Sequence, residues 1–197
     1  MDSALPPATS MVRAAGVRAV VLAGGQSRRM GVDKATMLVD GVAMARRVAD
    51  VAVAGGCTDV VALGGNPEML GVVGLAVVAD RWPGEGPLGA IAVALEHATG
   101  DVLVLACDLV WLDAAAVRLL LQSAAETPDV DVVCARSSQA ARVEPLCALW
   151  RPSALGVVAQ TFQSGERAVH VALAKLRVAS CEVPEGALRN ANTPADL

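Results

Sequence analysis

Residues 18–34 read RAVVLAGGQSRRMGVDK, an apolar run followed by two glycines and a group of cations. The run Arg18–Leu22 is short and nearly continuous in apolar residues, which is typical of a buried parallel strand. Glycines let backbone N–H groups approach an anion closely and converge on it. Arg29 and Lys34 add positive charge that suits phosphate oxygens. The pattern therefore predicts a strand leading into a phosphate-binding loop.

Outward from this segment, short apolar strands alternate with amphipathic helices. Strands are predicted at 59–63, 75–79, 101–106, 130–135, 146–150 and 176–183. Helices are predicted at 44–53, at 88–98, after a cap at Asp113 as far as about residue 125, from Pro152 onward and at 168–174. This alternation predicts a single-domain, three-layer α/β/α Rossmann-like nucleotidyltransferase fold with a mostly parallel central sheet. Residues 1–16 are rich in Ala, Pro and Ser and lack periodicity, so we expect a flexible leader before a domain spanning 17–197.

Composition excludes several classes of function. A net charge of -4 provides no general attraction to nucleic acid or to an anionic membrane. Aromatic residues make up only 2%, too few for a stacking platform that binds single-stranded nucleic acid. No apolar run approaches the ~20 residues that span a bilayer. The five cysteines form no C-x-x-C pair, so we expect reduced thiols and a cytoplasmic protein that contacts neither nucleic acid nor membrane.

Asp108 stands just after the apolar run 101–106. In doubly wound folds ligands bind at the carboxyl ends of the strands. Magnesium keeps several waters and commonly takes only one or two protein carboxylates together with phosphate oxygens. We therefore predict that Asp108 is a Mg²⁺ ligand; the alternative is that this aspartate caps a turn or helix.

The loop at residues 22–34 is neither a Walker A sequence nor a G-x-G-x-x-G fingerprint. Instead, its pattern L-A-G-G-x-S-x-R-M-G-x-D-K resembles the nucleotide-binding loop of the MobA family of molybdenum cofactor guanylyltransferases. These enzymes join GMP from GTP to molybdopterin and release pyrophosphate. The resemblance implies catalytic roles for Arg29, Lys34 and Asp108. It also implies guanine and ribose contacts from Leu22, Ala23, Gly24 and Gly25, and triphosphate contacts from Arg29 and Lys34.

The same resemblance extends to the segment that follows Asp80. Gly86, Pro87 and Leu88 match the family's G-P-L segment near the guanine, and the carboxylate of Asp80 can accept from the N1 and N2 hydrogens of that base. The alternative is a surface loop without a ligand. Many family members have Asn where this chain has Leu63, so any contact there must come from the backbone.

Three residues are implied on the acceptor side. Asn190 and Asn192 belong to N-A-N-T-P-A-D-L at residues 190–197, which resembles the family's N-x-N-T-P-x-[DE]-L. Arg167, in a G-E-R segment, would hold the molybdopterin phosphate. The asparagine segment can also serve as a helix cap, and Arg167 as a solvated arginine. Glu144 precedes Pro145 where the family often has Gln or His, and the pattern indicates no role for it.

The expected substrates are GTP and Mo-molybdopterin, with transient contacts to other molybdenum-cofactor proteins. Two alternatives remain open. One is a related nucleotidyltransferase with another base or acceptor, such as a molybdopterin cytidylyltransferase or a sugar-phosphate guanylyltransferase. The other is a non-catalytic nucleotide-binding partner, which the presence of both Lys34 and Asp108 disfavours.

Overall fold

The computed structural model describes residues 16–24, 34–137, 142–191 and 196. Within these residues a seven-stranded sheet runs in the order β5-β4-β1-β6-β8-β7-β9. The strands are β1 (Arg18–Leu22), β4 (Asp59–Leu63), β5 (Val77–Val78), β6 (Val102–Ala106), β7 (Val132–Ser137), β8 (Glu144–Trp150) and β9 (Val178–Val183). The pairs β1–β4, β1–β6, β4–β5 and β7–β9 are parallel, while β8 runs antiparallel to both β6 and β7. The predicted α/β fold with a mostly parallel sheet is confirmed.

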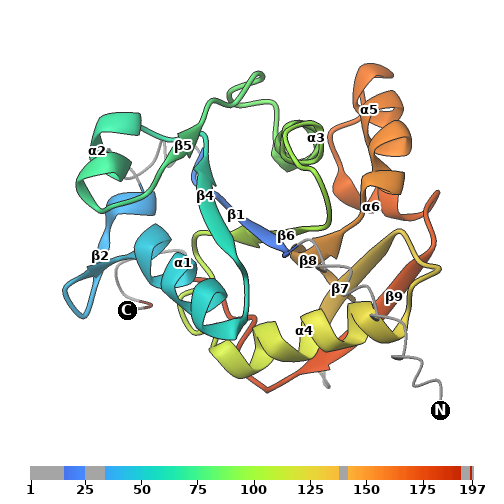
Figure 1. Cartoon of the computed structure of the whole chain (residues 1–197). Helices are drawn as coiled ribbons and strands as arrows, with labels where there is room; N and C mark the ends of the chain where they lie inside the picture. Colours follow the sequence, from blue (N-terminus) through green and yellow to red (C-terminus); the bar gives the residue numbers. More distant parts are fainter. Residues whose placement is uncertain (1–15, 25–33, 138–141, 192–195, 197) are drawn as a thin grey trace, which may run out of the picture.

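Helices cover both faces of the sheet (Figure 1). The α-helices are α1 (Met44–Gly55), α2 (Pro67–Val72), α3 (Pro87–Glu96), α4 (Ala114–Glu126), α5 (Leu155–Gln163) and α6 (Val169–Leu173). One core packs α1, α2 and α4 against one face, and the other packs α3, α5 and α6 against the opposite face. Along β6, Leu103 and Leu105 enter the first core and Val102 and Val104 the second. This alternation is the period of two that a strand buried on both sides imposes.

Several predicted boundaries shift. The strand expected at 75–79 contracts to Val77–Val78, and the one at 146–150 begins earlier, at Glu144. Pro152 opens a short 3-10 helix, η2 (Pro152–Ala154), and the α-helix begins only at Leu155. Proline suits the first turn of either helix type, so its position did not distinguish them.

Some short elements were not predicted from the sequence. They are the 3-10 helix η1 (Lys34–Thr36), the hairpin of β2 (Leu38–Val39) with β3 (Val42–Ala43), and α2, whose Asn66 cap accepts from the N–H of Glu68 and of Met69. Each is too short to display a recognisable periodicity. No helix among the described residues is both long enough and apolar enough to cross a membrane.

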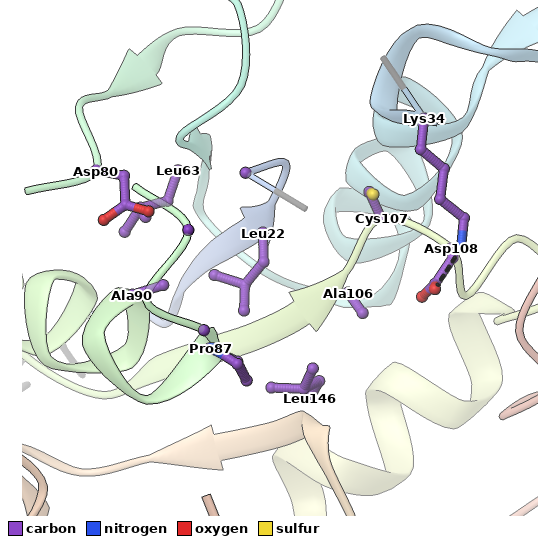
Figure 2. A pocket seen from close by; sticks show the side chains of 13 residues that line it. Leu22, Lys34, Leu63, Asp80, Pro87, Ala90, Ala106, Cys107, Asp108 and Leu146 are labelled. Atoms are coloured by element: carbon purple, nitrogen blue, oxygen red, sulfur yellow. Dashed lines mark hydrogen bonds and ion pairs between the residues drawn. The ribbon is translucent and has the colours of Figure 1, made fainter. Parts of the chain in front are cut away.

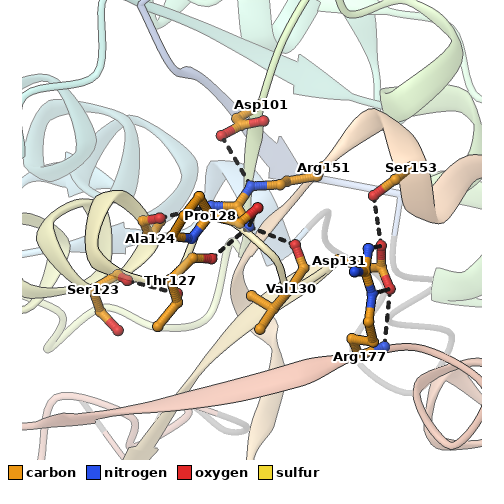
Figure 3. A network of polar contacts seen from close by, with 10 residues as sticks. All are labelled: Asp101, Ser123, Ala124, Thr127, Pro128, Val130, Asp131, Arg151, Ser153 and Arg177. Atoms are coloured by element: carbon orange, nitrogen blue, oxygen red, sulfur yellow. Dashed lines mark hydrogen bonds and ion pairs between the residues drawn. The ribbon is translucent and has the colours of Figure 1, made fainter.

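Two polar clusters lie where β8 ends and β7 begins (Figure 3). Arg151 donates to the carbonyls of Ala124 and Thr127, at 2.6 and 2.8 Å, where α4 ends. Asp131 accepts from Ser153 Oγ at 2.7 Å and from the backbone N–H and guanidinium of Arg177. The Arg177 guanidinium is the main cause that holds the pKa of Asp131 below its usual range. These contacts stabilise the fold and lie apart from the cavity described next.

Candidate nucleotide-binding site

The register of the sheet brings four loops to one edge. Leu22 at the end of β1 pairs with Leu63 of β4 on one side and with Ala106 of β6 on the other. Leu63 in turn pairs with Val78 of β5. The segments that follow these strands carry Gly24, Gly64, Asp80 and Asp108. Residues far apart in sequence therefore meet because their strands end at the same level.

A cavity of about 620 Å³ opens at this edge. Its lining residues are Leu22, Gly24, Lys34, Leu63, Asp80, Gly84, Gly86, Pro87, Ala90, Ala106, Cys107, Asp108 and Leu146. Figure 2 shows Asp80 and Leu63 at one end and Lys34 with Asp108 at the other. The volume is in the range of sites that hold small molecules and cofactors. A polar group at each end of an apolar trough suits an elongated ligand with two polar ends.

Lys34 and Asp108 form an ion pair at one end of the cavity. Lys34 Nζ lies 2.8 Å from Asp108 Oδ2, and the side chains are 16% and 19% exposed. Asp108 Oδ1 is buried and accepts no hydrogen bond within the described part of the chain. A buried carboxylate oxygen without a donor is costly, so this atom is suited to a cation or a donor from a ligand. The backbone of Asp108 is fixed separately, because its carbonyl accepts from Ala191 N at 3.0 Å.

At the other end, Asp80 is held by the turn that follows it. The N–H of Trp82 donates to Asp80 Oδ1 at 2.9 Å. The other oxygen, Oδ2, lies 3.5 Å from the point where a Cβ on Gly24 would stand. A side chain at Gly24 would therefore occupy the space beside the carboxylate, and the glycine leaves that space open. Gly86 and Pro87, at the start of α3, form the adjacent wall.

Seven of the residues expected to bind the nucleotide line the cavity: Leu22, Gly24, Lys34, Asp80, Gly86, Pro87 and Asp108. Two others do not, because Ala23 and Leu88 are buried in the two hydrophobic cores. Gly25, Arg29 and Asn192 lie outside the described residues.

Two of the expected acceptor residues, Asn190 and Arg167, are described, and both lie near residues that line the cavity without lining it themselves. Asn190 is exposed and precedes Ala191, whose N–H bonds Asp108. Arg167 lies next to Gly86, since a Cβ there would come within 4.0 Å of Arg167 Cβ. Its Nε is 2.6 Å from Glu85 Oε2, and its guanidinium stacks over Phe162. Arg167 therefore already has an anionic partner.

Glu144 and Leu146 were not recognised as site residues. Leu146 lines the cavity next to Pro87 (Figure 2), and its N–H donates to Glu144 Oε1 at 3.0 Å. Burial raises the pKa of Glu144, and the negative charge of Asp108 raises it further. Both residues lie on β8, whose antiparallel insertion beside β6 brings them to the site. Only the E-P-L pattern at 144–146 could have indicated them.

Other features bear on metals and thiols. Among the residues described, no group of three or more His, Cys, Asp or Glu side chains could hold a metal ion. Any ion at Asp108 would therefore depend on ligand oxygens and water, as is usual for Mg²⁺. All five cysteines are free thiols and buried, and burial raises the pKa of Cys57 to about 11.

Comparison with known proteins identifies related sequences. Residues 19–179 match the family described as "MobA-like NTP transferase domain". A relative from Pelotomaculum thermopropionicum, named "Probable molybdenum cofactor guanylyltransferase", is 34% identical and covers 95% of this chain and 91% of its own length. A relative of the same name from Nostoc sp. is 35% identical over 91% of this chain and 87% of its own length.

Solved structures share the fold. Molybdopterin-guanine dinucleotide biosynthesis protein A from Archaeoglobus fulgidus has a TM-score of 0.74 and 22% identity, covering 91% of this chain and 94% of its own. The 2-C-methyl-D-erythritol 4-phosphate cytidylyltransferase from Thermus thermophilus has a TM-score of 0.65 and 16% identity, covering 92% and 95%. The same architecture thus serves proteins named for different bases and acceptors, and the fold alone does not select between them.

Proposed function

Because the chain belongs to the MobA-like NTP transferase family, we propose that it is a molybdenum cofactor guanylyltransferase. It transfers GMP from GTP to Mo-molybdopterin, forming molybdopterin guanine dinucleotide and pyrophosphate. The relatives' names support this choice of substrates, and the cavity supports nucleotide binding.

The observation that carries the proposal is the Lys34–Asp108 pair at one end of the cavity, with Asp80 at the other. A nucleotide laid along the trough has its base beside Asp80 and its phosphates beside Lys34. The Asp80 carboxylate accepts from the N1 and N2 hydrogens of guanine, a pair of donors that cytosine lacks. Leu22 and Gly24 lie along the base and ribose, with Gly86 and Pro87 opposite. Ala23 and Leu88 support this wall from the two cores, and a backbone contact from Gly25 is part of the proposal.

Proteins of this family typically use a divalent metal ion, and we propose Mg²⁺ here. The donor set fits, because Asp108 Oδ1 is a buried carboxylate oxygen with no hydrogen-bond donor in the described chain. Asp108 would hold the ion together with phosphate oxygens and water. When bound, the ion neutralises negative charge on the phosphates.

The reaction is an in-line displacement at the α-phosphorus of GTP. An oxygen of the acceptor's terminal phosphate forms a bond to that phosphorus, and the bond to the bridging oxygen of pyrophosphate breaks. The attacking phosphate is already ionised, so no general base is needed. Lys34 and Arg29 stabilise the charge that builds on the leaving pyrophosphate, and the remaining work is orientation of two anions.

We further propose that Asn190, Asn192 and Arg167 contact the acceptor. The exposed position of Asn190 next to the residue that anchors Asp108 supports the first of these. For Arg167, the pairing with Glu85 must open or be shared when the acceptor arrives. A reducing cytoplasmic location with transient contacts to other molybdenum-cofactor proteins completes the proposal, and the five free thiols support a reducing compartment.

One observation favours testing cytosine as an alternative to guanine. Leu63 lines the cavity beside Asp80, and its aliphatic side chain offers no hydrogen bond to any base. The test is pyrophosphate release with GTP, CTP, ATP and UTP, each with and without molybdopterin. Release with GTP that requires molybdopterin is expected. Preference for CTP would identify the protein as a cytidylyltransferase instead. No pyrophosphate release with any of the four nucleotides would contradict an enzymatic role.

A further inference from the structure

Three arginines in the described chain lie over aromatic rings. The Cζ of Arg81 is 5.0 Å from the centre of the Trp82 ring, and that of Arg189 is 4.4 Å from the centre of the Trp111 ring. Arg167 lies 4.1 Å over Phe162. Stacking on an aromatic face holds a guanidinium in place and leaves its N–H groups directed outward along its edge.

The three differ in their anionic partners. Arg81 pairs with Glu96 at 2.8 Å, and Arg167 pairs with Glu85. Arg189 is exposed, and its guanidinium forms no ion pair or hydrogen bond with another described residue. The N–H groups of Arg189 are therefore free of a carboxylate among the described residues, and the guanidinium is positioned to bind an anionic ligand.

The position of Arg189 relates it to the reaction site. Two residues further on, Ala191 donates from its N–H to the carbonyl of Asp108, and its side chain is buried in a small cluster with Val110 and Trp111. The segment that carries Arg189 is therefore fastened to the loop 108–111 that carries the proposed metal ligand.

Three basic side chains contact this loop. Lys34 pairs with Asp108, and Arg47 donates from Nε to the carbonyl of Val110 at 2.8 Å. Arg189 adds a third positive charge on Trp111. Lys34 and Arg47 have carboxylate partners, Asp108 and Asp40, so Arg189 is the one cation of these three without a carboxylate partner among the described residues. Neither Arg189 nor Trp111 lines the 620 Å³ cavity, so a ligand they hold is separate from the one that fills it.

We propose that Arg189, held in place by Trp111, binds the phosphate monoester group of the acceptor substrate. The inference rests on the proposed function for the identity of that acceptor. The guanidinium presents paired N–H donors that match two oxygens of a phosphate, whereas a lysine would present a point charge. Binding there holds the attacking phosphate beside the Asp108 loop and offsets its repulsion from the nucleotide.

The first experiment does not depend on activity. In a Trp82→Phe variant, Trp111 and the fully buried Trp150 are the remaining tryptophans. Titration with inorganic phosphate is expected to produce a saturable change in tryptophan emission. Arg189→Ala should weaken that binding about tenfold or more, and Arg189→Lys should restore part of it. Arg81→Ala is the matched control, since Arg81 also lies over the aromatic ring at position 82 but has its own carboxylate, Glu96. A titration unchanged by Arg189→Ala, or no saturable change in any variant, overturns the inference.

The second experiment uses the transfer reaction with GTP and molybdopterin varied separately. Arg189→Ala is expected to raise the KM for molybdopterin about tenfold or more and leave the KM for GTP within about twofold. An equal rise in both would assign Arg189 to the nucleotide and overturn the inference. If the wild-type protein transfers no nucleotide at all, the proposed function fails, and the phosphate titration still decides whether Arg189 is an anion site. Trp111→Leu is a second variant that should reproduce part of the loss by releasing the guanidinium.

Discussion

At the scale of single residues, the candidate site depends on one carboxylate with two different oxygens. Asp108 Oδ2 pairs with Lys34, while Oδ1 is buried without a hydrogen-bond donor in the described chain. The first oxygen orients the side chain and the second remains to be satisfied by a ligand. Lys34 therefore contributes to the site in two ways: it supplies a positive charge, and it orients the Asp108 carboxylate.

Removal of the Lys34 ammonium should therefore impair transfer strongly. We expect Lys34→Ala to cost about 2–4 kcal/mol of transition-state stabilisation, seen as a fall in kcat/KM for GTP, because a preorganised charge near the leaving group is lost. Lys175→Ala is the control: Lys175 is the other lysine of the sequence and donates to Thr161, away from the cavity. Unchanged turnover in Lys34→Ala would remove this residue from the mechanism.

At the scale of elements, the loops after β1 and β4 touch through glycines with different tasks. A Cβ on Gly64 would lie 3.0 Å from the Cα of Gly24, and Gly64 has a φ of +72°. Gly24 has ordinary space for a Cβ, 3.5 Å from Asp80 Oδ2 and 3.7 Å from the Cα of Gly64. Gly64 permits the two backbones to meet, and Gly24 keeps the cavity open beside Asp80.

Alanine substitutions should separate these tasks. Gly64→Ala is expected to lower the free energy of unfolding by about 1–2 kcal/mol, because a left-handed conformation is costly for a residue with a Cβ. Gly24→Ala should leave stability nearly unchanged and weaken GTP binding, since its methyl group enters the cavity. Urea denaturation and GTP titration of both variants measure this. Equal destabilisation by the two substitutions would contradict the assignment.

A second element-scale prediction concerns the end of α4. Arg151 donates to the carbonyl of Ala124, in the last turn of α4, and to that of Thr127, which follows the helix. No later helical turn provides N–H donors for these carbonyls, because the helix ends there. Arg151→Ala should lower the free energy of unfolding by about 1.5–3 kcal/mol, because hydrogen bonds from a charged donor are lost. Thermal denaturation would detect this as a lower Tm. A Tm like that of Arg118→Ala, in which an exposed arginine loses one carbonyl contact, would contradict it.

At the scale of the whole molecule, the sheet joins two halves of different character. The half built on β5, β4, β1 and β6 is parallel and carries the cavity. The other half contains the antiparallel strand β8 and is fastened by Asp131, which is 7% exposed and links β7 to Ser153 and Arg177. The stability of that half should therefore depend on the charge of one carboxylate.

The dependence on pH has a definite sign. Hydrogen bonds from Arg177 lower the pKa of Asp131 in the folded protein relative to about 3.9 in the unfolded chain. The stabilisation is fully present above the unfolded pKa and is lost as pH falls below about 4 toward the lower folded pKa. Asp131→Asn should be less stable than wild type at pH 7, and the difference should narrow as pH falls through that range. Urea denaturation at a series of pH values measures it, and a difference constant with pH would contradict this account.

The sequence by itself determined the strands and helices with long apolar patterns, and it predicted a phosphate-binding loop at residues 22–34 and a metal-binding role for Asp108. These features are local: a buried strand, a glycine pair or a carboxylate after a strand is visible within a few residues. The bounds of β1 and β4 and the cap at Asp113 follow from such patterns.

Only the tertiary structure decided which distant residues meet. A strand buried on both faces is apolar whichever direction it runs, so the antiparallel course of β8, which brings Glu144 and Leu146 to the site, left no local signal. The approach of Asp80 to Gly24 depends on strand register, and the stacking of Arg189 on Trp111 depends on a contact across 78 positions of sequence. Pairing between distant segments is selected by the packing energy of the whole chain, and no short segment contains that information.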